Sequence, residues 1–129
     1  MSAVDQDVVI RATINGLCAD VYAGNVEAGW YTDVATGQPK ARNIGELLML
    51  IVSEVAEGME GYRKSLPDDK LPHRPMLEVE LADACIRIFD LAGYQGLDLG
   101  GAIIEKRAYN ATREDHKIEA RKAAGGKAF

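Results

Sequence analysis

Apolar residues in this chain recur with the 3.6-residue period of an α-helix, and no segment alternates with period two over the length of a strand. This pattern predicts an all-α fold. The helical spacing predicts four helices, at about 5–23, 44–64, 75–92 and 102–122. Asn43 is a residue type that commonly caps a helix, and it directly precedes the second of them. A long loop at 24–43 and a loop with three prolines at 65–75 separate the first three helices.

The expected helices fit one domain that spans residues 1–129, with a flexible tail at about 123–129. The stretch 93–101, which contains four glycines, is expected to turn the chain before the last helix. Helices joined by short connections typically form a bundle, here of four to five helices. The helix at 75–92 is apolar over two faces, which predicts a central position. A bundle this small often completes its core by dimerising, so we expect a homodimer.

Charge and apolar content limit the partners that this chain is expected to have. Its formal net charge of −5 argues against a nucleic acid polymer, because a duplex binder normally presents a basic face. The N-terminus lacks the basic and apolar stretches of a signal peptide, and the longest apolar run, 47–52, is too short to span a bilayer. Cys18 and Cys85 lie in expected helices, which favours two buried free thiols in a reducing compartment. Together these features predict a cytoplasmic protein without a membrane partner.

Two pairs of acidic residues have a spacing that places both members of a pair on one helical face. Glu54 and Glu57 are three residues apart in the second expected helix, and Glu80 and Asp83 repeat this spacing in the third. The neighbours of Glu54 on its face are apolar or glycine: Leu47, Leu50, Gly58 and Gly61. A carboxylate there is costly unless a partner compensates its charge. If the two helices pack antiparallel, the pairs converge into a site of oxygen ligands suited to Mg²⁺.

A stripe of cationic and amide side chains follows the last expected helix. Lys106, Asn110 and Arg113 recur at i, i+4 and i+7, and Lys117 continues the stripe. Arginine can hold phosphate oxygens through two hydrogen bonds, and lysine supplies a point charge. The stripe therefore suits a polyphosphate, although a solvated face near a helix C-terminus gives the same pattern.

Two aromatic residues, Trp30 and Tyr31, lie in the long loop at 24–43. Either ring could stack on a nucleobase. For Trp30, a place as a plug in the core fits the sequence equally well.

The acidic pairs also resemble the signature of a known family. Glu54-x-x-Glu57, followed after a gap of 22 residues by Glu80-x-x-Asp83, is similar to the motif of the MazG-type, all-α nucleoside triphosphate pyrophosphohydrolases. The segment from Lys106 to Arg113 resembles that family's Lys and Asn/Arg segment. The similarity runs from about residue 43 to 129 and is strongest to short, stand-alone phage and bacterial members. Residues 1–42 carry much less of it, so the base and sugar preference stays open.

The resemblance implies an assembly, an activity and a set of site residues. The assembly is a homodimer or a homotetramer built as a dimer of dimers. The activity is Mg²⁺-dependent hydrolysis of a (deoxy)nucleoside triphosphate to the monophosphate and pyrophosphate, with Mn²⁺ as a substitute metal. Nucleotide-pool control would be its role, and a purine nucleotide such as dGTP or dATP is one candidate substrate. The metal-binding and catalytic residues would be Glu54, Glu57, Glu80 and Asp83. The substrate would be held by Lys106, Asn110 and Arg113, with Trp30 as a further contact.

Two other classes of protein compete with this interpretation. Carboxylate-bridged di-iron bundles use Glu-x-x-His pairs, and this chain contains none. A non-enzymatic helical dimerisation or regulatory module would carry its acidic pairs only as solvated helix faces. Binding of Mg²⁺ and of a non-hydrolysable nucleotide distinguishes the enzyme from such a module.

Overall fold

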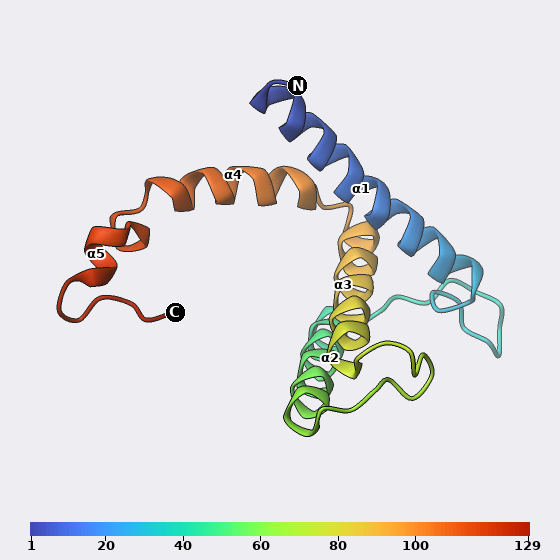
Figure 1. Cartoon of the computed structure of the whole chain (residues 1–129). Helices are drawn as coiled ribbons and strands as arrows, with labels where there is room; N and C mark the ends of the chain where they lie inside the picture. The colour runs from blue at the N-terminus through green and yellow to red at the C-terminus, as the bar shows by residue number, and fades with distance from the viewer. The chain divides into compact units, whose positions relative to one another are not determined.

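The computed structural model describes residues 1–129 and confirms the all-α fold (Figure 1). The helices are α1 (Ala3–Glu27), α2 (Ile44–Lys64), α3 (Met76–Gln95), α4 (Leu99–Thr112), the 3₁₀ turn η1 (Glu114–His116) and α5 (Ile118–Lys122). There are no strands, only two isolated β-bridges. The chain forms two compact units, 16–97 and 1–15 with 98–129. No helix combines the length and the apolar character needed to cross a membrane.

Helix α2 begins and ends where local chemistry favours it. The side chain of Asn43 accepts a hydrogen bond of 3.1 Å from the backbone N–H of Glu46, which confirms the predicted N-cap. At the other end Ser65 adopts a left-handed conformation, and its N–H bonds to the carbonyls of Gly61 and Tyr62. The proline-containing loop follows, and α3 starts directly after Pro75. The predicted boundaries of α2 and of this loop are confirmed.

Helices α2 and α3 form an antiparallel hairpin, and two glycines of α2 lie where the helices contact each other. A Cβ atom on Gly61 would lie 2.6 Å from Cγ of Met76, and one on Gly58 would lie 3.4 Å from Cβ of Glu80. Gly61 follows Gly58 in α2, whereas its neighbour Met76 precedes Glu80 in α3. This reversed order shows that the two helices are antiparallel. The missing side chains let α3 approach α2 closely, so the carboxylates on the two helices can meet.

The segment between α1 and α2 is anchored by an aromatic cluster. Helix α1 runs to Glu27, so the loop is shorter than predicted. Tyr31 is buried, and its ring centroid lies 5.0 Å from that of Tyr22 and 4.7 Å from that of Tyr94. A Cβ atom on Gly93 would lie 2.5 Å from Cβ of Tyr22, which shows how closely α1 and α3 approach here. The loop is thereby fixed beside α3.

In the other compact unit, Asp98 organises the start of α4. Its carboxylate caps the helix by accepting from the N–H of Gly101, and it also accepts from Arg11 at 2.6 Å and Asn15 at 2.7 Å. A Cβ atom on Gly100 would lie 2.6 Å from the carbonyl oxygen of Arg11. The prediction that 93–101 is a turn was therefore wrong at both ends. Gly100 and Gly101 lie inside α4, where Gly100 permits close contact with α1 and Gly101 leaves room for the capping carboxylate of Asp98.

The predicted helix at 102–122 is also wrong, because α4 ends at Thr112. Arg113 has an extended backbone, and its guanidinium pairs with Asp115 at 2.7 Å. Residues two apart on a continuous helix do not face each other, so this pair requires the helix to break. Lys127 also binds Asp115, at 2.6 Å, and thus helps to fix the break.

The apolar surface of α2 is only partly covered within the chain. Leu47 is buried, but Leu48, Val55 and Tyr62 on the apolar stripe of α2 are exposed by 47%, 51% and 71%. Cys18 is buried as predicted, whereas Cys85 is exposed, and both are free thiols. The prediction of a second buried thiol was wrong because that face of α3 has no partner within the chain. Self-association, which would cover these faces, stays a prediction.

Candidate metal centre

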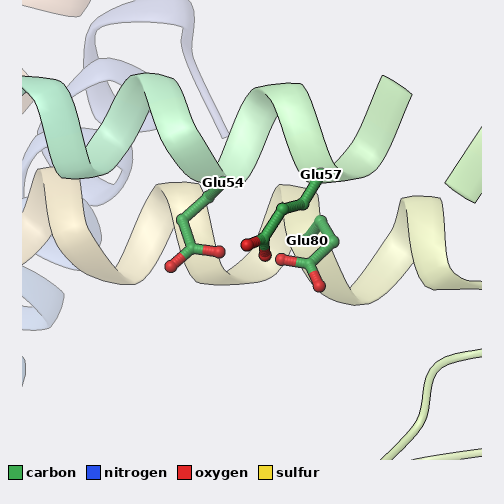
Figure 2. Close-up of side chains that lie close together, drawn as sticks. All are labelled: Glu54, Glu57 and Glu80. Carbon is green, nitrogen blue, oxygen red and sulfur yellow. The ribbon is translucent and has the colours of Figure 1, made fainter. Parts of the chain in front are cut away.

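Three carboxylates meet where α2 and α3 run side by side. Each of Glu54, Glu57 and Glu80 offers an oxygen, and these oxygens all lie within 4.8 Å of one another. Figure 2 shows the first two projecting from α2 and the third from α3, with their carboxyl groups next to one another. The predicted convergence of the two helices is therefore observed for three of the four acidic residues.

Two members of this group are withdrawn from solvent. Glu54 and Glu80 are each only 8% exposed, whereas Glu57 is exposed. Oxygen Oε2 of Glu80 is buried and has no hydrogen-bond partner. A buried polar atom without a partner is costly and calls for an explanation, such as an ion. Burial, hydrogen bonding with Glu54 and the charges of the neighbouring carboxylates raise the pKa of Glu80 to about 7.

Arg87 on α3 compensates the charge of Glu54. Its Nε donates to Oε1 of Glu54 at 2.6 Å. Burial alone would raise the pKa of Glu54, but the hydrogen bonds from Arg87 and Glu80 and the Arg87 charge lower it overall. The surroundings thus favour the anionic form of Glu54, while Glu80 takes up a proton at a higher pH than an ordinary glutamate does. The two residues titrate as a linked pair.

Asp83, the fourth predicted ligand, lies outside the three-carboxylate group. It is half-buried and lines a cleft that Glu54 also lines. Burial and the charge of Glu54 raise the pKa of Asp83, and Arg87 opposes this. The spacing of Asp83 from Glu80 was read correctly, but sharing a helical face did not bring its oxygens into the group.

The donor set of this group fits a hard divalent cation. Mg²⁺ binds oxygen ligands, usually one or two carboxylates with several waters. Glu54, Glu57 and Glu80 supply such oxygens from two helices. The unpartnered Oε2 of Glu80 is the atom that a cation would satisfy. Because Glu80 must lose its proton to bind metal, metal affinity is expected to increase with pH.

A cleft of about 510 Å³ adjoins the group and lies wholly within unit 16–97. Besides Glu54 and Asp83, its polar and aromatic lining comprises Asn25, Trp30, Arg42, Arg87 and Asp90. Trp30 is 63% exposed, so the alternative of a core plug was wrong and the ring is accessible for stacking. Tyr31 is buried and presents no such surface.

The predicted phosphate-binding residues belong to the other compact unit, 1–15 with 98–129. Lys106 is exposed and its Nζ lies 4.8 Å from the ring centroid of Tyr109. Asn110 is half-buried, and its Oδ1 has no hydrogen-bond partner. Arg113 directs its guanidinium to Asp115. A continuous helical stripe was therefore a wrong description, because α4 ends before Arg113. Phosphate binding by these residues stays a prediction.

Several residues of the cleft were not identified from the sequence. Asn25 and Arg42 come from the end of α1 and the loop, where no helical period places them. Asp90 had a detectable signal, since it follows Asp83 and Arg87 at i+7 and i+3 and so shares a helical face with them. Polar residues recurring on one side of a central helix indicate a lined cavity.

Comparison with known proteins identifies no relative of this chain. No family model matches the chain. No curated protein and no solved structure matches it either. The resemblance to the MazG-type family therefore rests on the motif residues alone.

Proposed function

We propose that this chain is a Mg²⁺-dependent nucleoside triphosphate pyrophosphohydrolase of the MazG type. The observation that carries the proposal is the three-carboxylate group of Glu54, Glu57 and Glu80, with its unpartnered Oε2. The adjoining cleft offers room for a nucleotide and holds both aromatic and cationic side chains. The reaction would add water to the α-phosphorus, breaking the bond to the β-phosphate and releasing pyrophosphate and a nucleoside monophosphate.

The roles of the chain's own residues follow from their chemistry. Glu54, Glu57 and Glu80 would hold Mg²⁺, which when bound neutralises phosphate charge and favours ionisation of water. Asp83 lines the cleft beside Glu54, and its raised pKa suits it to accept a proton from the attacking water. Arg87 fixes the orientation of Glu54 through its hydrogen bond of 2.6 Å.

Phosphate recognition would draw on cationic side chains. Arg42 and Arg87 line the same cleft as the carboxylates. The family resemblance adds Lys106, Asn110 and Arg113 for the triphosphate. Single substitutions of Arg42 and Lys106 to alanine separate these two sources, since the residue that binds triphosphate raises KM when it is removed.

The test is pyrophosphate release from a panel of ribo- and deoxynucleoside triphosphates with Mg²⁺. Glu57→Gln is the informative variant, because Glu57 is exposed and its replacement leaves the hairpin core intact. We expect its rate to fall by at least about 100-fold, since residues that only support metal ligands already contribute about 10- to 100-fold. Glu60→Gln, on the same helix and outside the group, is the matched control and should keep the wild-type rate. Full activity of Glu57→Gln, or no pyrophosphate from any triphosphate, contradicts the proposal.

A non-enzymatic dimerisation or regulatory module is the second candidate. It is favoured by the exposed apolar residues of α2, which recur at Leu48, Val52, Val55, Met59 and Tyr62. Such a face typically binds another helix. Isothermal titration distinguishes the candidates, because a module of this kind binds neither Mg²⁺ nor a non-hydrolysable triphosphate.

A further inference from the structure

A second buried carboxylate lines the cleft away from the three-carboxylate group. Asp90 on α3 is only 7% exposed. Its Oδ2 accepts a hydrogen bond of 2.8 Å from the hydroxyl of Tyr31, and its Oδ1 is buried without a partner. An unsatisfied acceptor of this kind is rare in a folded protein. Nothing in the proposed hydrolysis uses it.

The contacts around Asp90 fix the position of its side chain. Tyr31 is held by the rings of Tyr22 and Tyr94, and the Arg42 guanidinium lies 5.7 Å from its ring centroid. Burial and the Asp90 carboxylate raise the pKa of Tyr31, so its hydroxyl keeps the proton that it donates. The Asp90 side chain therefore cannot turn to satisfy Oδ1 elsewhere without giving up this bond.

Asp90 lies at a useful distance from the metal-binding residues. It is seven residues after Asp83 on α3, which corresponds to about 10 Å along the helix axis. Both residues line the cleft, and so do Trp30 and Asn25. A nucleotide whose phosphates approach Asp83 and Glu54 would thus extend its sugar and base towards Asp90.

We infer that Asp90 is a specificity-determining residue, which accepts a hydrogen bond from the amino group of a nucleobase stacked on Trp30. The ligand class is therefore an amino-bearing nucleoside, with adenine, cytosine or guanine as base. Uracil and thymine are disfavoured because the carbonyl oxygens beside their N3–H would face the carboxylate, and an acceptor-only group repels them. For its ligand class this inference rests on the proposed function.

The test measures nucleoside binding and needs no hydrolysis. Trp30 is the only tryptophan, so quenching of its fluorescence reports stacking at this cleft. Free nucleosides are titrated without Mg²⁺, in pairs that differ by the amino group: adenosine against purine riboside, and cytidine against uridine. The amino-bearing member of each pair should bind at least about tenfold more tightly, the effect of one hydrogen bond to a charged group. Equal affinities within the pairs, or no quenching by any nucleoside, overturn the inference.

Variants assign the discrimination to Asp90. In Asp90→Asn the ratio within each pair should fall below about threefold, because the amide presents a donor as well as an acceptor. Tyr31→Phe removes the positioning hydroxyl and should lower the ratio without abolishing stacking. Asp20→Asn, an exposed site on α1, is the control and should keep the wild-type ratio. An unchanged ratio in Asp90→Asn contradicts the assignment. If that variant does not fold, the nucleoside pairs measured on the wild-type chain still test the inference.

The outcomes also separate this inference from the proposed function. Discrimination between nucleosides without pyrophosphate release would retain the role of Asp90 and refute the hydrolysis. The opposite result is pyrophosphate release at equal efficiency from all triphosphates, with no discrimination among nucleosides. It would retain the hydrolysis and refute the role of Asp90. Weak binding of both members of a pair with equal affinity would indicate that water satisfies Oδ1.

Discussion

Replacing Glu80 by glutamine should stabilise the metal-free protein and strongly reduce its stabilisation by Mg²⁺. Glu80 is 8% exposed, and its pKa is raised from an ordinary value near 4.5 to about 7. A shift of this size corresponds to about 3 kcal/mol at 1.36 kcal/mol per pKa unit. Glu54, whose pKa is lowered by its bonds with Arg87 and Glu80, offsets part of this. We therefore expect a gain of about 1–3 kcal/mol for Glu80→Gln at pH 8.

The pH dependence of this effect has a definite sign. Between pH 4.5 and about 7 the folded state binds the Glu80 proton more tightly than the unfolded state does. The free energy of unfolding of the wild type therefore falls as the pH rises through this window, and the cost is complete above it. Below pH 4.5 both states are protonated, so the difference between Glu80→Gln and the wild type should vanish.

Urea denaturation at pH 4.5 and pH 8, each with and without Mg²⁺, provides the assay. At 100 times its dissociation constant a ligand adds about 2.7 kcal/mol to the wild type. Glu80→Gln should gain far less, because it lacks one of the three carboxylates. Glu78→Gln, an exposed site on the same helix, should behave as the wild type. The reasoning is refuted if Glu80→Gln is less stable than the wild type at pH 8 without metal, or if Mg²⁺ stabilises both equally.

Three further substitutions test other parts of the structure. Gly61→Ala should cost about 1–3 kcal/mol in urea denaturation, because its Cβ would lie 2.6 Å from Cγ of Met76. Trp30→Ala should change stability by less than about 0.5 kcal/mol, since the side chain is 63% exposed; nucleoside affinity should nevertheless fall, as stacking contributes about 1–3 kcal/mol per base. Arg87→Met removes the partner of Glu54, and its side chain is 40% exposed, so we expect a loss of about 1 kcal/mol at pH 7. That loss should diminish in acid as Glu54 becomes protonated, which a pH series of denaturation curves measures.

Each of these three predictions has a result that would contradict it. Gly58→Ala is the control for the first, since its Cβ would lie at an ordinary 3.4 Å from Cβ of Glu80. Equal stability of the two glycine variants would show that close approach at Gly61 is not required. Unchanged nucleoside affinity in Trp30→Ala would exclude stacking on this ring. A pH-independent loss in Arg87→Met would exclude the ion pair with Glu54 as its cause.

The sequence was sufficient for those features that depend on local periodicity. The boundaries of α2 followed from the apolar spacing and the cap at Asn43, and the prolines located the loop before α3. The spacing of Glu54 and Glu57 placed both on one face, and apolar neighbours indicated that Glu54 is buried. The same spacing placed Gly58 and Gly61 on the face of Glu54, and in the structure α3 approaches α2 at these glycines.

Features that depend on residues distant in sequence could not be obtained in this way. The end of α4 is set by Asp115, which pairs with Arg113 and also with Lys127. Helical periodicity continues through this region, so it gave one long helix instead. The contact of Tyr31 with Asp90 joins residues 59 positions apart, and no local pattern reports it.

The same limit applies to burial. An apolar stripe on α2 has the same sequence pattern whether it faces this chain or a partner. Leu48, Val55 and Tyr62 belong to this stripe, and the chain itself leaves them exposed. Periodicity predicts which residues share a face and does not determine what covers that face.

The central claim is that carboxylates from α2 and α3 share one divalent cation. The most direct test is a crystal structure grown with Mn²⁺ and measured by anomalous scattering. The expected result is a peak about 2.1 Å from oxygens of Glu54, Glu57 and Glu80, close to the distance for Mg²⁺ and oxygen. A protein that is saturated with Mn²⁺ in solution but shows no peak between these three residues would contradict the claim.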